Sequence, residues 1–142
     1  MRGRVVAFDP GDRRIGVAVS DPEGKIALPR PTIQRSGESW PWRALLEAIR
    51  EAEATRLVVG DPIHLDGSTG ARSRISHELA DELARRTGLP VDLQDERLTS
   101  VQATRALGEG GSSRGKSVDV DRAAAILILQ AWLDRHARDA ES

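Results

Sequence analysis

The sequence contains no cysteine, which excludes disulfide bonds and thiolate chemistry. It has no apolar run near the roughly 20 residues that a membrane-spanning helix needs, and its N-terminus lacks the apolar core of a signal peptide. From these absences we expect a soluble cytoplasmic protein that does not contact a membrane.

Lysine is scarce, since Lys25 and Lys116 are the only lysines among 21 cationic residues. Arginine is suited to bidentate phosphate contacts, although a compositional bias explains the excess equally well. The formal net charge of -1 does not by itself indicate nucleic-acid binding. At 142 residues the chain can bury a substantial core, and we expect one domain at residues 1–138 followed by a frayed tail at 139–142.

The order of the apolar patterns predicts an α/β fold. Short apolar runs bounded by turn residues predict strands at 4–9, 14–20, 25–33, 57–60 and 91–94. Helical spacing predicts helices at about 42–52, 99–107 and 120–136, and one marked by Ile75, Leu79 and Leu83 that Gly88, Leu89 and Pro90 stop. Short turns join the first three strands, so these should form an antiparallel meander whose third, proline-containing strand lies at the edge. The β/α units that follow complete a five-stranded mixed sheet with helices on both faces.

Acidic residues lie where three of these elements begin or end. Asp9 ends the first strand, Asp95 and Glu96 end the last strand, and Asp119 and Asp121 open the last helix. Each could merely cap a turn or a helix. Functional groups, however, collect beyond the carboxyl ends of parallel strands, so we expect these carboxylates to converge at one edge of the sheet. There they would repel each other unless a cation lay between them.

The absence of cysteine and of clustered histidine favours Mg²⁺ or Mn²⁺ over zinc at such a site. Two of these ions would activate water and stabilise the leaving oxygen in phosphodiester hydrolysis. The three histidines, His64, His77 and His136, lack metal-ligand spacing, and we expect them at the surface or in satisfied hydrogen bonds. The acidic pattern therefore predicts a divalent-metal site that hydrolyses phosphodiester bonds.

Five cationic side chains lie near these acids and could hold phosphates of a substrate. They are Arg13, Arg14, Arg97, Arg114 and Lys116. The first three could bind phosphate oxygens or pair with the neighbouring acids, and both interpretations stay open. The last two stand in a glycine- and serine-rich loop that could follow a nucleic-acid backbone or simply be solvated.

Four ordered stretches resemble the YqgF (RuvX-like) family, a bacterial group with the ribonuclease H fold. They are FDPGDRRIGVAVSD at 8–21, VVGDP at 58–62 with DG at 66–67, DERLTSVQA at 95–103, and VDRAAAILILQ at 120–130. The resemblance extends from about residue 4 to residue 133, and the order and spacing of the four stretches make it specific.

The resemblance implies that Asp9, Glu96 and Asp121 are the metal-binding catalytic carboxylates, with Asp95 close by. It also implies a role in maturation of the 5′ end of precursor 16S ribosomal RNA. The family is associated with Holliday junction resolution too, because its fold is shared with RuvC-type resolvases.

Two residues depart from the family pattern. Asp61 stands where the family usually has an apolar residue, and His64 stands where an asparagine is common. Other ribonuclease H-like enzymes often carry an acid after the central strand. Asp61 is therefore an additional candidate metal ligand.

We predict a divalent-metal-dependent nuclease that acts on structured or single-stranded RNA, with pre-ribosomal particles as possible partners and a monomer or homodimer as its state. One alternative is a DNA junction resolvase, which needs a dimer to make two symmetric cuts. A second is a non-catalytic nucleic-acid-binding module. A third is an actin- or hexokinase-like ATPase, which shares the acidic opening motif but needs two lobes where 142 residues supply one.

Overall fold

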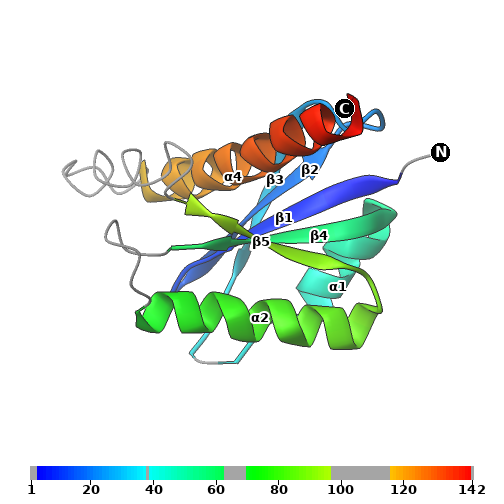
Figure 1. Cartoon of the computed structure of the whole chain (residues 1–142). Helices are drawn as coiled ribbons and strands as arrows, with labels where there is room; N and C mark the ends of the chain where they lie inside the picture. The colour runs from blue at the N-terminus through cyan, green and yellow to red at the C-terminus, as the bar shows by residue number, and fades with distance from the viewer. Residues whose placement is uncertain (1–2, 38, 63–69, 97–115, 142) are drawn as a thin grey trace.

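The computed structural model describes residues 3–37, 39–62, 70–96 and 116–141, and it describes their side chains except at 116–121 and 138–141. These residues form a five-stranded sheet in the order β3-β2-β1-β4-β5, with helices on both faces (Figure 1). The strands are β1 (Arg4–Pro10), β2 (Arg14–Ser20), β3 (Ala27–Gln34), β4 (Ala54–Asp61) and β5 (Val91–Asp95). The helices are α1 (Trp42–Glu51), α2 (Ala71–Thr87) and α4 (Lys116–Glu141).

The sheet is mixed, as the order of apolar patterns predicts. β1, β2 and β3 form an antiparallel meander, while β4 pairs parallel with β1 and β5 pairs parallel with β4. Pro29 and Pro31 lie in β3 at the edge of the sheet, where a residue without an N–H group can face away from the ladder. The predicted meander, the edge position of its third strand and the parallel β4 are confirmed.

Each face of the sheet has its own apolar core, because alternate residues of a strand point to opposite faces. Val5 and Ala7 of β1 pack in the core that α4 covers. Val6 and Phe8 of the same strand pack in the core formed with α1 and α2. This alternation assigns every residue at a strand end to one face, and it determines which acidic side chains can meet.

α1 and the end of α2 agree with the predicted helices, but α2 and α4 begin earlier than the apolar spacing predicts. α2 begins at Ala71 rather than near residue 75, and it ends at Thr87 before Gly88, whose φ of 71° forms a left-handed C-cap. α4 begins at Lys116 rather than near residue 120 and extends to Glu141. Polar terminal turns carry no apolar periodicity, so the pattern marks only the buried middle of a helix. The predicted helix at 99–107 lies outside the described residues, and fraying of 139–142 stays a prediction.

Candidate active site

The carboxyl ends of β1, β4 and β5 lie at one end of the sheet, beside the N-terminal ends of α2 and α4 (Figure 1). Asp9 lies near the end of β1, Asp61 and Asp95 end β4 and β5, and Glu96 follows directly. Asp9, Asp61 and Glu96 are buried, with 3%, 4% and 0% of their surface exposed, and Asp95 is half-buried. A buried carboxylate loses its hydration, so it requires hydrogen bonds or a cation nearby.

Asp9 and Glu96 lie on the face of the sheet that α4 covers. Strand alternation places Asp9 on the same face as Ala7, which packs in the core under α4. A Cβ atom added to Gly60 would lie 3.1 Å from Glu96 Oε2 and 2.5 Å from Ile128 Cδ1 of α4. β4 lies between β1 and β5, so the glycine leaves the space between the two acids without a side chain from the intervening strand.

Asp61 and Asp95 lie on the opposite face, which packs against α2. The two residues are register partners in the parallel pair β4–β5. Asp61 follows Gly60 and Asp95 precedes Glu96, so each lies on the opposite face from that neighbour. Ser73 Oγ of α2 donates a 2.6 Å hydrogen bond to Asp61 Oδ1, and His77 Nε2 lies 2.9 Å from Asp61 Oδ2. Both oxygens of the Asp61 carboxylate are therefore engaged by α2.

Sequence reasoning missed this contact between Asp61 and α2. Ser73 and His77 are four residues apart, so they share one face of the helix, and that spacing is the signal that could have paired them with a buried acid. The expectation that the histidines make satisfied hydrogen bonds is confirmed for His77 and for His136, whose Nδ1 lies 2.9 Å from the Trp132 carbonyl oxygen. His64 lies outside the described residues.

The third predicted carboxylate, Asp121, belongs to the first part of α4. It precedes Ile128, the residue that packs against Gly60, by two helical turns or about 10 Å. α4 begins at the end of the sheet where β1 and β5 terminate (Figure 1). Among the side chains that the structure describes, no three His, Cys, Asp or Glu residues are arranged to hold a metal ion, and Asp121 is outside that set.

Comparison of the sequence with family models and with curated proteins identifies the family of this chain. The family model described as "RuvX: Holliday junction resolvase" matches residues 3–135. The chain belongs to the RuvX family. A protein of Rhodococcus jostii named "Putative pre-16S rRNA nuclease" is 44% identical over 143 residues, covering 96% of this chain and 80% of that protein. A protein of Myxococcus xanthus with the same name is 43% identical over 134 residues, covering 94% of this chain and 89% of that protein. The RuvX family is one of nucleases, enzymes that hydrolyse phosphodiester bonds.

The fold of this RuvX chain is ribonuclease H-like, as the sequence resemblance implies. The solved structure of Thermus thermophilus RuvC in complex with a Holliday junction substrate superposes with a TM-score of 0.61. The two chains are 16% identical, and the match covers 99% of this chain and 98% of that one. Within the part of the chain that the structure describes, no helix has the length and apolar character needed to cross a membrane.

The predicted substrate-binding cations of this RuvX chain begin at the turn between β1 and β2. Gly11 N donates a 3.0 Å hydrogen bond to the Arg14 carbonyl oxygen, and a Cβ on Gly11 would lie 2.7 Å from that oxygen, so the turn requires glycine. The neighbouring acid Asp12 pairs with Arg72 at 3.5 Å rather than with Arg13, which is exposed. This arrangement leaves the Arg13 guanidinium in solvent beside the strand that carries Asp9.

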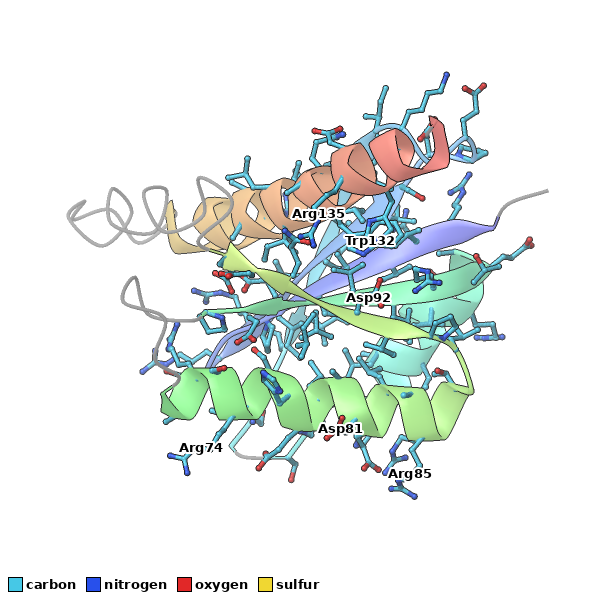
Figure 2. All side chains as sticks on the ribbon, in the orientation of Figure 1. Arg74, Asp81, Arg85, Asp92, Trp132 and Arg135 are labelled. Carbon is cyan, nitrogen blue, oxygen red and sulfur yellow. The ribbon has the colours of Figure 1, made fainter. Side chains whose placement is uncertain are left out.

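The other predicted cations are described less fully. Arg14 is half-buried, and Arg97 and Arg114 lie outside the described residues. Lys116 begins α4, but its side chain is not among those described. On the far side of the sheet, Arg74 of α2 points away from the strands (Figure 2). The roles of all five cations stay predictions.

The Asp61 contacts lead to a prediction that separates a structural role from a ligand role. Replacing Asp61 with alanine should lower the free energy of unfolding by about 1–3 kcal/mol, because the buried Ser73 hydroxyl loses its acceptor. Asp61→Asn keeps an acceptor oxygen for Ser73 and should cost less. Urea denaturation measures both. Mn²⁺ titration provides the second readout: Asp61→Asn should weaken metal affinity much less than Asp9→Asn, and an equal loss would instead support the predicted ligand role of Asp61.

Proposed function

We propose that this chain is a divalent-metal-dependent nuclease whose catalytic carboxylates are Asp9, Glu96 and Asp121, and that it matures the 5′ end of precursor 16S ribosomal RNA. The observation that carries the proposal is the placement of two buried carboxylates, Asp9 and Glu96, on one face of the sheet on either side of Gly60. The names of its relatives from Rhodococcus jostii and Myxococcus xanthus support the choice of substrate.

The residues present fit a hard divalent cation. Asp9 and Glu96 supply carboxylate oxygens, the ligands that Mg²⁺ and Mn²⁺ prefer, and the chain contains no thiolate that would favour a softer metal. Two buried carboxylates on one face of the sheet, separated by a single strand, also carry a desolvation and repulsion cost that a cation offsets. The absent side chain at Gly60 keeps space between them that a Cβ atom would occupy. When bound, one or two such ions would lower the pKa of water and stabilise the leaving oxygen.

The chain's own residues would hold and orient the reacting groups. Asp9 is carried by β1, the central strand, so packing on both faces of the sheet restrains its backbone. Glu96 follows β5 and is fully buried, which restricts its rotamers and favours one direction for its carboxylate. We assign phosphate binding to Arg13 and Arg14 on the turn beside Asp9, with Arg97, Arg114 and Lys116 as further contacts.

A second candidate function is resolution of four-way DNA junctions. The description of the matching family model and the fold shared with RuvC favour it. Two symmetric cuts across a junction require two active sites related by a dimer axis. A chain that stays monomeric at working concentration would therefore count against this alternative, and light scattering on the eluting protein measures that state.

The test is a side-by-side cleavage assay. The wild-type chain is incubated with a precursor 16S RNA fragment that spans the mature 5′ end, and separately with a four-way DNA junction, each over a titration of Mg²⁺ and Mn²⁺. We expect metal-dependent cleavage of the RNA at defined positions and slower or no cleavage of the junction. Preferential cleavage of the junction would replace the RNA assignment with the resolvase. Binding without cleavage of either substrate at any metal concentration would favour a non-catalytic module.

A further inference from the structure

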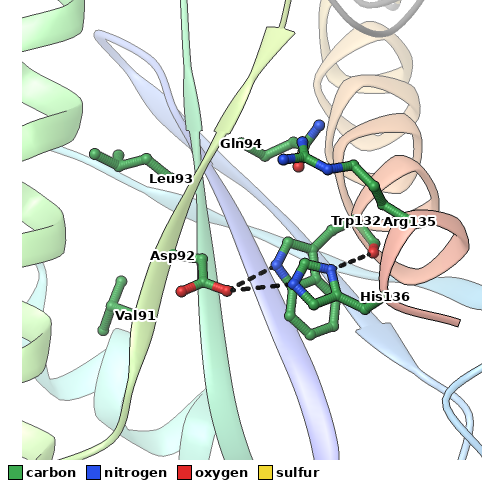
Figure 3. Close-up of a pocket in the computed structure, with 7 residues that line it drawn as sticks. All are labelled: Val91, Asp92, Leu93, Gln94, Trp132, Arg135 and His136. Carbon is green, nitrogen blue, oxygen red and sulfur yellow. Dashed lines mark hydrogen bonds and ion pairs between the residues drawn. The ribbon is translucent and has the colours of Figure 1, made fainter. Parts of the chain in front are cut away.

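A cavity of about 290 Å³ lies between β5 and α4, on the same face of the sheet as Glu96. Its lining comes from residues 91–94 of β5 and from Trp132, Arg135 and His136 of α4 (Figure 3). β5 is the edge strand, so the cavity lies where the sheet ends and the helix overhangs it (Figures 1 and 2). No step of the proposed reaction uses these residues.

The negative charge in the cavity is already balanced by the protein. Asp92 Oδ2 accepts a 2.9 Å hydrogen bond from Trp132 Nε1 and lies 3.2 Å from Arg56 Nη1. His136 Nε2 lies 4.0 Å from the same oxygen (Figure 3). Arg135, by contrast, is exposed and has no acidic partner among the residues that the structure describes. The lining of the cavity therefore includes a cation that can bind an anion.

The lining of the cavity also includes a buried amide. Gln94 is 1% exposed, and its Nε2 atom has no hydrogen-bond partner in the described structure. An unmade hydrogen bond on a buried donor costs free energy, so this donor indicates an acceptor that the described residues do not supply. Gln94 is the register partner of Gly60 and lies two residues before Glu96 on the same face of β5. The amide is thus the part of the cavity nearest to the carboxylate site.

An aromatic surface forms a further part of the lining, beside Asp92 (Figure 3). The rings of Trp132 and His136 stack with their centroids 3.8 Å apart and an interplanar angle of 18°. The indole is buried, but the His136 side chain keeps 41% of its surface exposed, so a planar group can stack on the outer face of the imidazole. An acceptor, a planar ring and an anion are together the components of a nucleotide.

We propose that this cavity binds one nucleotide of the substrate strand, beyond the phosphodiester that is cut. Arg135 contacts its phosphate, the base stacks against His136, and the Gln94 amide donates a hydrogen bond to an acceptor of the same nucleotide. A strand whose scissile phosphate lies at Asp9 and Glu96 would reach the cavity by passing toward Gln94, which lies two residues before Glu96. This subsite rests on the proposed nuclease function, because that function supplies the strand.

Binding of a labelled single-stranded oligoribonucleotide, followed by fluorescence anisotropy in EDTA, tests the subsite without cleavage. Arg135→Ala should raise the Kd several-fold and lower the slope of log Kd against log salt by about one. The matched control is Arg43→Ala, which removes the same charge from an exposed position on α1, on the other face of the sheet, and should change neither quantity. An unchanged Kd and slope for Arg135→Ala would overturn the proposal.

Gln94→Met separates binding from stability. Methionine has a similar volume and removes the donor that lacks a partner among the described residues, so the melting temperature should stay the same or rise while RNA affinity falls. A lower melting temperature with unchanged affinity would show that Gln94 serves only the fold. The proposed hydrogen bond from the Gln94 amide to the nucleotide would then be wrong.

The cleavage assay distinguishes failure of the subsite from failure of the proposed function. If the wild-type chain cuts RNA and Arg135→Ala leaves KM and Kd at wild-type values, the subsite is wrong and the nuclease assignment stands. If the wild-type chain cuts nothing but RNA affinity depends on Arg135 and Gln94, the subsite stands and the nuclease assignment fails. With both correct, Arg135→Ala raises KM and leaves kcat near the wild-type value.

Discussion

Asp9→Asn should lower metal-dependent cleavage by about a thousandfold, equivalent to ~4 kcal/mol of transition-state stabilisation. Asparagine has nearly the same shape as aspartate but lacks its charge, so it weakens cation binding without leaving a cavity. Asp9 is 3% exposed and lies on the face of the sheet shared with Glu96, where there is little water to compensate for the lost charge. Single-turnover cleavage at saturating Mn²⁺ measures the loss.

The fold of the Asp9→Asn variant should be retained, because removing a buried negative charge relieves repulsion from Glu96. Its melting temperature in EDTA should equal or exceed that of the wild-type chain. Asp12→Asn is the matched control: Asp12 lies three residues further along and pairs with Arg72 at an exposed site, where an ion pair contributes little. Asp12→Asn should cleave at close to the wild-type rate. Undiminished metal-dependent cleavage by Asp9→Asn would remove the carboxylate assignment.

Gly60→Ala should lower both stability and cleavage, for two separable reasons. The added Cβ would lie 2.5 Å from Ile128 Cδ1, which forces α4 or its side chain to move and should cost about 1–3 kcal/mol of unfolding free energy. It would also lie 3.1 Å from Glu96 Oε2 and displace that carboxylate by a few tenths of an ångström. Catalytic groups tolerate little displacement, so we expect cleavage to fall about tenfold or more.

A second substitution separates the two effects of Gly60→Ala. Ile128→Val removes the Cδ1 atom that collides with the new methyl group, so the double variant should recover stability relative to the sum of the single changes. Cleavage should stay low in the double variant, because the contact with Glu96 remains. Ile128→Val alone is the control and should cleave normally at a cost of about 0.5–1.5 kcal/mol. Recovery of full cleavage in the double variant would show that Gly60 affects only packing.

The proposed subsite and the carboxylate site share one strand, and this has a consequence for engineering the chain. Gln94 of β5 and Glu96, which follows β5, both face α4. A shift of the strand by one residue would turn them away from α4 and turn Asp95 toward it. The register Gly60↔Gln94 and Asp61↔Asp95 therefore controls both sites together. Substitutions that weaken the pairing of β4 with β5 should impair cleavage and RNA binding in parallel.

The amino-acid sequence by itself determined the order of strands and helices, the mixed sheet, and the acidic residues at the strand ends. These features depend on local patterns: apolar runs bounded by turn residues for β1 and β2, a buried run for β4, and acids placed directly after them. Asp9 could be singled out because it ends an apolar strand at a glycine turn. The resemblance to a family then favoured Glu96 over Asp95 after the last strand, and Asp121 over Asp119 at the start of the last helix.

Only the tertiary structure decided which of these acids share a face. Asp61 and Asp95 also end strands, but alternation along β4 and β5 directs them toward α2, where Ser73 and His77 engage Asp61. Which helix covers which face depends on contacts between segments far apart in the chain, and no local pattern encodes it. The same reason explains why the cavity was not foreseen: Gln94 and Arg135 belong to elements that meet only when α4 packs on the sheet.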